Sequence, residues 1–319
     1  MKATLIYNTK AGNTNALSPE EIQDALYDVG YHPVYKATRH MSDLDTILED
    51  AKGLIIAAGG DGTAKAVATR LIGNKDAALT ILPMGTANNL AKTLGIAGSP
   101  LEIIKRLDQP HEHRFDMGHI TAPWGEDYFT EGAGFGFFAQ VLSTYDPRKG
   151  KSVVRSLQSL VDVFRDGYGQ ETTIRFPNQE ISTEFLLAEV LNTRAIGPRL
   201  KFAPDADPTD GLLHLVCIDG EKQESYFNYL SRLLTEDVAD MPSVQTYKVP
   251  HLEISWNGFP FHIDDHLQPD EFIKNDPDSD LPPRGFLKEN EMIRVKVIPN
   301  ALNVWLPKLP EGETYEHKF

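Results

Sequence analysis

The most distinctive segment of this chain is an apolar run that ends in a glycine turn and continues as a helical pattern. The apolar run covers residues 54–58, the turn is Gly59-Gly60-Asp61-Gly62-Thr63, and the helical pattern covers residues 64–72. This order predicts a strand, a tight turn and a helix. Three more apolar or β-branched runs, at residues 3–7, 33–37 and 79–83, alternate with helical patterns up to about residue 110. Because strands that alternate with helices form parallel sheets, we predict an α/β domain here.

Two helix starts in this part of the chain carry the same signal. Ser18-Pro19-Glu20-Glu21 and Ser99-Pro100-Leu101-Glu102 each place a serine before a proline and a glutamate three residues after the serine. The serine accepts a hydrogen bond from the first helical turn, proline suits the first helical position, and the glutamate completes a capping box. Helices are therefore predicted to begin at Pro19 and Pro100.

Strand patterns dominate after about Arg114. The predicted strands are residues 128–132, 172–176, 185–192, 212–218 and 252–256, and helical patterns occur near residues 153–164 and 225–234. Residues 269–284 are rich in Asp and Pro and predict an exposed excursion, while residues 293–302 predict an alternating strand followed by a turn. A region made mainly of strands predicts a β-sandwich.

The charge balance excludes one class of partner. The chain has 319 residues, which predicts about two domains at roughly 150 residues each. It carries 31 Lys and Arg against 46 Asp and Glu, a formal net charge of -15. This charge repels polyphosphate backbones and argues against a nucleic acid as the principal partner. It also repels anionic lipid headgroups, so any membrane contact has to be local.

The single cysteine and the absence of a long apolar stretch bear on the compartment. Cys217 cannot form an intramolecular disulfide, and it lies in an apolar strand pattern where a buried, unreactive thiol is expected. No window approaches 18 uninterrupted apolar residues, and the first residues are too weakly apolar for a signal peptide. We therefore expect a cytoplasmic protein.

The glycine turn at residues 59–63 suits a phosphate ligand. Glycines let the backbone approach a ligand closely, and the amides at the start of the following helix point toward the turn. Asp61, at the mouth of such a turn, would accept a proton from a hydroxyl or hold Mg2+ that neutralises the phosphates. The alternative is an ordinary tight turn in which Asp61 caps the helix.

A second turn, with Gly85, Thr86 and Asn88, follows the next predicted strand. Both turns follow the carboxyl ends of parallel strands, so they should be neighbours, and Thr86 and Asn88 would then bind phosphate or ribose. The alternative is a helix capped by an asparagine. The sequence contains no GxxxxGK[ST] motif of a Walker loop, and the glycines at residues 132–136 do not have the spacing of the dinucleotide-binding motif.

The sequences GGDGT at residues 59–63 and PMGTANNLA at residues 83–91 together resemble the catalytic-domain family of diacylglycerol kinases. This family includes bacterial soluble lipid kinases and sphingosine and ceramide kinases, whereas NAD kinases share the GGDG turn without the second segment in this form. The resemblance covers essentially the whole chain. It implies a Rossmann-like α/β nucleotide-binding domain of residues 1–122 and about 298–319, and a β-sandwich lipid-substrate domain of residues 123–297.

The resemblance implies an ATP-dependent lipid kinase that transfers the γ-phosphate of Mg-ATP to a lipid hydroxyl, with diacylglycerol as the default acceptor. A nucleotide-binding regulatory pseudokinase and a relative of the NAD kinases are the alternatives. Residues 8–12 resemble the family's first NPxxG-type loop, with Thr9 in place of proline. The implied nucleotide-binding residues are Asn8, Thr9, Lys10, Gly59, Gly60, Gly62, Thr63, Gly85, Thr86 and Asn88.

Two motifs of the second domain imply metal and catalytic roles. Residues 203–213 resemble the family's APxAxxxDGLL stretch, which implies Asp210 as a ligand of a structural Mg2+; a hairpin turn at this aspartate is the alternative. Asp264-Asp265-His266 stands where many members have Asp-Gly-Glu. Asp264 is then the second catalytic carboxylate beside Asp61. His266 is either a base that works near neutral pH or a solvated side chain.

Two further departures from the family are Asn89, where aspartate is usual, and Glu131, where many members have asparagine. Together with His266 they leave the preferred lipid and metal open. The implied partner is a lipid substrate at a membrane surface, which a cytoplasmic protein would visit transiently. The sequence also leaves a homodimer open.

Overall fold

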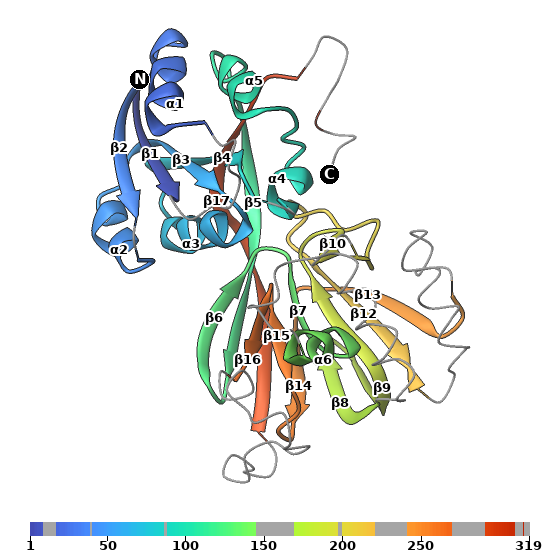
Figure 1. Cartoon of the computed structure of the whole chain (residues 1–319). Coiled ribbons are helices and arrows are strands. Elements are labelled where there is room, and N and C mark those ends of the chain that lie inside the picture. Colours follow the sequence, from blue (N-terminus) through green and yellow to red (C-terminus); the bar gives the residue numbers. More distant parts are fainter. Residues whose placement is uncertain are drawn as a thin grey trace. The chain divides into compact units, whose positions relative to one another are not determined.

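The computed structural model describes residues 1–8, 17–38, 40–85, 88–144, 169–196, 200–220, 241–269, 291–309 and 315. The chain divides into two units (Figure 1): Met1–Met117 with Pro299–Phe319, and Gly118–Ile298. The family resemblance implies a first boundary between residues 122 and 123 and a second near residue 298. The first unit is therefore discontinuous along the chain, and the second is one continuous segment.

The first unit is built on a parallel sheet. Its strands are β1 (Lys2–Asn8), β2 (His32–Thr38), β3 (Gly53–Gly59) and β4 (Ala77–Pro83), in the order β4-β3-β1-β2. Residues 54–58 of β3 are all buried, as expected for a strand whose sheet is covered on both faces. Val304 lies in parallel register beside Leu79 of β4, so the segment after residue 298 adds another strand to this sheet.

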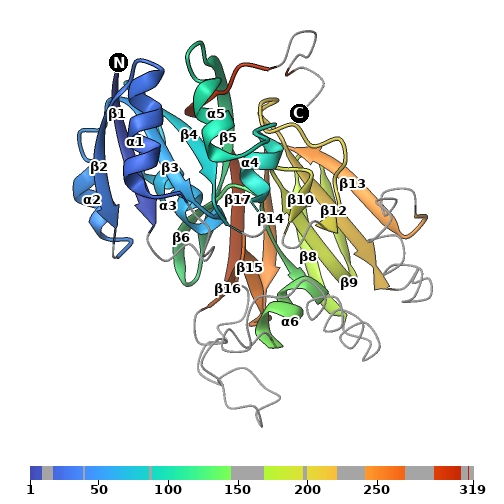
Figure 2. The same cartoon turned by 45° about the horizontal axis from the view of Figure 1, so that its top comes forward.

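The helices of the first unit lie on both faces of the sheet. They are α1 (Pro19–Asp28), α2 (Asp43–Leu48), α3 (Asp61–Leu71), α4 (Asn89–Thr93) and α5 (Pro100–Lys105). α1 packs beside α5 and α2 packs beside α3, on opposite faces (Figure 2). At α1 the Glu21 amide donates to Ser18 Oγ (3.2 Å) and the Ser18 amide donates to Glu21 Oε2 (2.8 Å), and α5 begins with the same capping box. Both predicted helix starts are confirmed.

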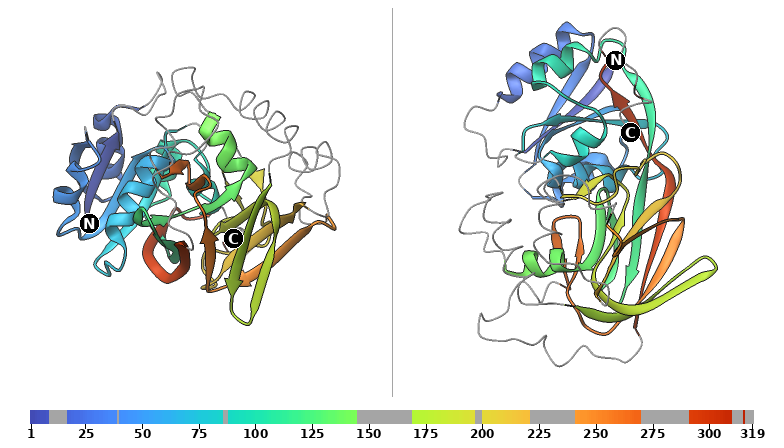
Figure 3. Two further views of the ribbon diagram at one scale, coloured as in Figure 1. Left: turned by 90° about the horizontal axis from the view of Figure 1, so that it is seen from below. Right: turned by 90° about the vertical axis from the view of Figure 1, so that its right-hand side faces the viewer.

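The second unit is a β-sandwich of antiparallel strands. Neighbours are hydrogen-bonded along the order β16-β15-β7-β9-β8-β14-β17, β12 pairs with β9 and β13, and β5 pairs with β6 and β17. β8 and β9 form a long hairpin, yellow-green in Figure 3. In the core, the ring of Phe135 packs against the rings of Phe185 and Phe259. The elements are β5 (His111–Ala122), β6 (Gly125–Phe129), β7 (Gly132–Gly136), α6 (Phe137–Thr144), β8 (Gln170–Phe176), β9 (Gln179–Leu191), β10 (Ala195–Ile196), β11 (Leu200–Lys201), β12 (Leu213–Asp219), β13 (Val244–Val249), β14 (His251–Trp256), β15 (Phe261–Ile263), β16 (His266–Gln268) and β17 (Glu291–Leu306).

Two sequence-based predictions about strands are wrong. The predicted strand at residues 128–132 is broken between β6 and β7, because the amides of residues 130–132 donate to the carboxylate of Asp264. The predicted turn after residue 298 is replaced by one strand, β17, that continues to Leu306. There the Asn300 amide donates to Asp116 Oδ1 at 2.7 Å, which holds the left-handed Asn300 (φ 52°) within the strand.

The predicted helices near residues 153–164 and 225–234, and residues 270–284 of the predicted excursion, lie outside the described residues. No helix in the part of the chain that the structure describes is long and apolar enough to cross a membrane. Cys217 is buried on β12, and burial raises the pKa of its thiol above the usual range, so this cysteine stays protonated.

Candidate active site

The glycine turn joins β3 to α3. Gly60 is the N-cap residue of α3 in an extended conformation, and its carbonyl accepts from the amides of Thr63 and Ala64, both at 3.0 Å. Gly59 has to be glycine, because a Cβ there would lie 2.5 Å from Thr63 Oγ1. The first amides of a helix have no acceptor within the helix. The turn therefore lies at the positive end of the α3 dipole, an arrangement that can bind an anion.

The structure brings the second turn against the first. A Cβ on Gly85 would lie 2.6 Å from the Cα of Gly60, so the two turns touch backbone to backbone. The Met84 amide donates to the Gly59 carbonyl at 2.8 Å. Asp61 Oδ1 accepts from the Leu90 amide at 3.1 Å, across the two turns. Gly60 and not Asp61 is the N-cap of α3, and the carboxylate of Asp61 instead accepts from the first turn of α4.

Asn8, Thr63 and Asn88 fix these turns through side-chain hydrogen bonds. Asn8 Nδ2, at the end of β1, donates to Thr63 Oγ1 at 2.9 Å. Asn88 is left-handed (φ 51°); its Oδ1 accepts from the Gly85 amide at 2.9 Å and its Nδ2 donates to the Gly85 carbonyl at 2.8 Å. Asn88 makes no side-chain cap bond to α4, so an asparagine cap does not explain this residue. The other predicted binding residues, Thr9, Lys10 and Thr86, lie outside the described residues.

Gly62 differs from the neighbouring glycines. Among the described residues, no atom lies within 4 Å of a Cβ built on Gly62, whereas a Cβ built on Gly59 or Gly85 would clash. Gly62 also lies in α3, where glycine is less favourable than alanine by roughly 0.5–1 kcal/mol. Packing among the described residues therefore does not require glycine at this position, and none of their atoms fills the space beside the Gly62 Cα.

In the second unit, the predicted catalytic residue Asp264 anchors a turn. Its Oδ1 accepts from the amides of Glu131 (2.9 Å) and Gly132 (3.2 Å), and its Oδ2 accepts from the Thr130 amide (3.2 Å). Asp264 is left-handed (φ 52°), 7% exposed, and its own amide donates to the Gly132 carbonyl at 2.8 Å. These contacts give the carboxylate a structural task, and a catalytic role for Asp264 stays a prediction.

The residues after Asp264 are presented at the surface. Asp265 and His266 have side chains that are 52% and 61% exposed, and His266 Nδ1 lies 2.7 Å from Asp265 Oδ1. His266 pairs with Ile263 where β15 turns into β16. A carboxylate beside an imidazole is the arrangement that orients a histidine base. Sequence reasoning did not assign Asp265 a role, although its place next to His266 was the available signal.

Asp210, the predicted ligand of a structural metal, has protein partners. Its Oδ1 accepts from the Leu212 amide at 2.9 Å, and its Oδ2 lies 3.7 Å from Lys248 Nζ. Within the described residues, no group of three or more His, Cys, Asp or Glu side chains is placed to hold a metal ion. Metal binding at Asp210 therefore stays a prediction that rests on the resemblance.

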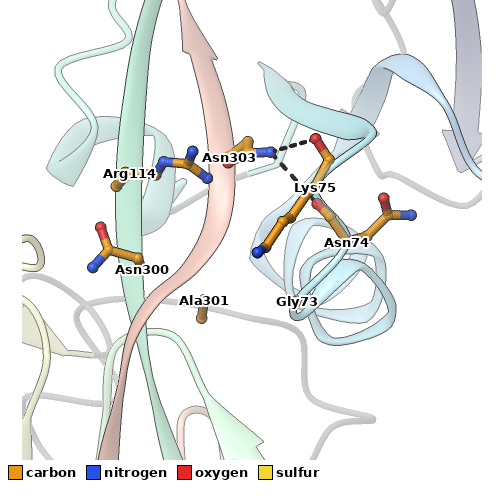
Figure 4. Close-up of a pocket in the computed structure, with 7 residues that line it drawn as sticks. All are labelled: Gly73, Asn74, Lys75, Arg114, Asn300, Ala301 and Asn303. Atoms are coloured by element: carbon orange, nitrogen blue, oxygen red, sulfur yellow. Dashed lines mark hydrogen bonds between the residues drawn. The ribbon is translucent and has the colours of Figure 1, made fainter.

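A separate pocket of about 310 Å³, whose lining residues Figure 4 shows, lies beside the start of β4, at the other end of that strand from the second glycine turn. Asn303 Nδ2 donates to the carbonyls of Lys75 (3.2 Å) and Ala77 (3.2 Å), which ties the segment before β4 to β17. The pocket is lined by Gly73, Asn74, Lys75, Arg114, Asn300, Ala301 and Asn303. Because the lining contains none of the predicted site residues, this pocket is not part of the candidate active site.

Comparisons with known proteins agree with the two units. Residues 2–120 match the diacylglycerol kinase catalytic domain, and residues 157–305 match the YegS C-terminal NAD kinase beta sandwich-like domain. A probable lipid kinase, YegS-like, from Klebsiella pneumoniae is 30% identical over 230 residues, which are 68% of this chain and 74% of that protein. A protein of the same name from Pseudomonas aeruginosa is 28% identical over 312 residues, covering 95% and 93%.

Solved structures share the fold. The crystal structure of a diacylglycerol kinase from Bacillus anthracis has a TM-score of 0.66 at 17% identity and covers 96% of both chains. Yeast NADH kinase has a TM-score of 0.51 at 10% identity and covers 98% of this chain and 84% of its own. These likenesses show an α/β unit followed by a β-sandwich in kinases of different substrates. On the family matches and the identity to the Klebsiella relative, the chain belongs to the diacylglycerol kinase catalytic domain family, among the YegS-like lipid kinases.

Proposed function

We propose that this protein transfers the γ-phosphate of ATP to the hydroxyl of a lipid, with diacylglycerol as the first acceptor to test. The observation that carries the proposal is the pair of touching glycine turns with open space beside Gly62, in a chain of a lipid kinase family. Phosphoryl transfer depends on positioned phosphates and on neutralised charge, more than on covalent chemistry by the protein. The turns would position the phosphates, because backbone amides at the start of α3 can donate hydrogen bonds to phosphate oxygens.

The residues of the turns also fit Mg2+. This ion is commonly held by one or two carboxylates and completes its coordination with phosphate oxygens and water. Asp61 places one carboxylate at the start of α3, and Mg2+ bound there would neutralise phosphate charge. Thr63 is held by Asn8, and both are assigned to orient the phosphates together with Gly59, Gly60 and Gly62. Gly85 and Asn88 are assigned to the nucleotide.

The turn of β15 and β16 offers a base for the acceptor. His266 beside Asp265 can take the proton of the lipid hydroxyl, since an imidazole with an adjacent carboxylate is suited to this task near neutral pH. Asp264 shapes the turn that presents the two residues. The lipid acceptor implies transient contact with a membrane surface from the cytoplasm. The net charge of -15 favours weak adsorption to anionic vesicles.

The experiment that tests the function is the identification of the phosphorylated product. The whole protein is incubated with radiolabelled ATP and a total lipid extract, with and without Mg2+, and labelled lipids are identified by mass spectrometry. We expect a labelled lipid that depends on Mg2+. ATP binding without any labelled lipid would favour a regulatory pseudokinase, to which the departures at His266 and Asn89 point. NADP formed from added NAD would favour an NAD kinase relative.

Gly62→Ala tests whether ligand phosphates occupy the space beside α3. The free energy of unfolding should stay the same or rise by up to about 1 kcal/mol, because the methyl group meets no atom of the residues that the structure describes and alanine favours the helix. ATP affinity should fall at least about tenfold, a loss of roughly 1.4 kcal/mol. Urea unfolding and titration calorimetry measure the two quantities. Unchanged affinity in a variant that folds normally would contradict phosphate binding at this turn.

A further inference from the structure

Three residues form one row across three strands of the second unit. His262 on β15 pairs with Gly134 on β7, and Gly134 pairs with Glu189 on β9. A Cβ at Gly134 would clash with the Ala188 carbonyl oxygen and would also lie 2.5 Å from Glu189 Oε2, so only glycine leaves the space in which the two outer side chains meet. His262 Nε2 and Glu189 Oε2 are 2.7 Å apart. The Ala188 carbonyl and this contact together account for glycine at position 134.

The Glu189–His262 pair is fully buried, with both side chains 0% exposed. The ring of Phe138 from α6 meets the imidazole edge-on at 4.7 Å, and the ring of Phe261 stacks at 6.4 Å. Burial raises the pKa of Glu189, an effect that His262 opposes. Among the described residues, Glu189 Oε1 has no hydrogen-bond partner. An ionised carboxylate in such a place is costly unless a cation faces it, so the pair is stable only as a unit.

The second ring nitrogen of His262 fixes where the protons are. Nδ1 lies 3.1 Å from the carbonyl oxygen of Asp264, and a carbonyl only accepts, so Nδ1 carries a hydrogen. A second proton then lies between His262 Nε2 and Glu189 Oε2, bonded to one atom or the other. In both forms the pair is neutral as a whole, which suits its burial.

His262 adds one contact to those that hold Asp264. The amide of Asp264 donates to the Gly132 carbonyl, its carboxylate accepts from three amides of residues 130–132, and its carbonyl accepts from His262. Left-handed backbone at a residue other than glycine needs such support from its surroundings. The Glu189–His262 pair therefore connects the sandwich core to the turn that presents Asp265 and His266.

We propose that Glu189 and His262 are positioning residues: Glu189 orients the imidazole, and His262 Nδ1–H holds the Asp264 carbonyl so that the turn keeps one conformation. Their effect on catalysis rests on the proposed function, in which this turn serves the acceptor hydroxyl. Their effect on the turn itself does not depend on that function. The geometry assigns the holding contact to Nδ1 and the orienting contact to Nε2.

Two substitutions of His262 separate these contacts. The side-chain amide of asparagine approximates the place of Nδ1, and that of glutamine approximates the place of Nε2. We expect His262→Asn to keep slow hydrogen exchange at residues 264–266, and His262→Gln to speed it at least about tenfold. With lipid and ATP, His262→Gln should lower kcat at least about tenfold at unchanged KM for ATP, while His262→Asn and Glu189→Gln stay within about threefold. Asp45→Asn, at an exposed ion pair on α2, is the control variant and should change neither the hydrogen exchange at residues 264–266 nor kcat.

The protonation of His262 can also be measured in the protein without substitutions, so this part of the test does not depend on whether the variants fold. Nitrogen-15 spectra of histidine-labelled protein should show His262 with a hydrogen on Nδ1 that exchanges slowly, assigned by its loss in His262→Gln. A ring without that hydrogen would overturn the proposal, and so would equal effects of the two substitutions on exchange or on folding. If the protein phosphorylates no lipid but the exchange rates differ as expected, the proposed function fails and the positioning role stands.

Discussion

Asp61→Asn should lower the rate of lipid phosphorylation by roughly a hundredfold or more, the scale of a lost proton-transfer or charge-stabilising group. The substitution removes the negative charge at the start of α3 and keeps an oxygen that can accept from the Leu90 amide, now 3.1 Å from Asp61 Oδ1. The melting temperature should therefore stay close to that of the unchanged protein. Initial rates with radiolabelled ATP and a lipid extract, together with thermal unfolding, measure both effects.

Asp61→Ala is the matched variant, since it removes the charge and also the acceptor of the Leu90 amide. It should be as inactive as Asp61→Asn and less stable by about 1 kcal/mol. Asp45→Asn, which breaks the exposed contact between Asp45 and Arg70, should leave the rate unchanged. Full activity in Asp61→Asn would show that Asp61 serves only the contact to α4, and would remove it from the catalytic assignment.

Asp264→Gly should destabilise the second unit by about 3–5 kcal/mol. Glycine tolerates the left-handed conformation at this position, so the substitution isolates the loss of the carboxylate. Three buried amides then lose a charged acceptor; one hydrogen bond to a charged group contributes roughly 1.5–3 kcal/mol, and the three costs are not additive because the bonds share one carboxylate. For a unit of this size the melting temperature should fall on the order of 10 °C. Denaturant unfolding followed by tryptophan fluorescence measures the change.

Asp264→Asn should have an intermediate effect, because its amide oxygen can still accept while its NH2 group faces a backbone donor. Asp265→Gly is the neighbouring control; it removes an exposed contact to His266 and should cost less than about 1 kcal/mol. Near-equal stability of Asp264→Gly and the unchanged protein would mean that water replaces the carboxylate, and that the turn does not depend on it.

The parts of the fold that sequence predicts are those governed by local chemistry. The capping boxes at Ser18 and Ser99 and the apolar strand before Gly59 each depend on residues close in sequence, and the structure has them in place. The strand predicted at residues 128–132 depends on a residue more than a hundred positions away. The Asp264 carboxylate accepts hydrogen bonds from the backbone amides of residues 130–132, which a continuous strand would use for pairing. The residues near position 130 contain no signal of this distant acceptor.

The candidate site shows the same division. Glycines at residues 59–63 and at residue 85 predict close approach of the backbone, but their mutual contact follows from the pairing of β3 with β4. The contact between Asp61 and Leu90 depends on that pairing as well. Glu189 and His262 meet only because β15, β7 and β9 share one register at Gly134. A register across three strands is set by the whole sandwich, so neither residue could be assigned from its neighbours in sequence.

Strand β17 has a consequence for the order in which the protein can mature on the ribosome. Its residue Val304 supplies the neighbour of Leu79 in the parallel sheet, yet it is synthesised only after the entire sandwich segment. Until then, β4 has no β17 beside it, and the sheet that carries the glycine turns lacks one of its strands. A stalled nascent chain that ends before residue 299 should therefore be more open to protease in the first unit than the released protein is.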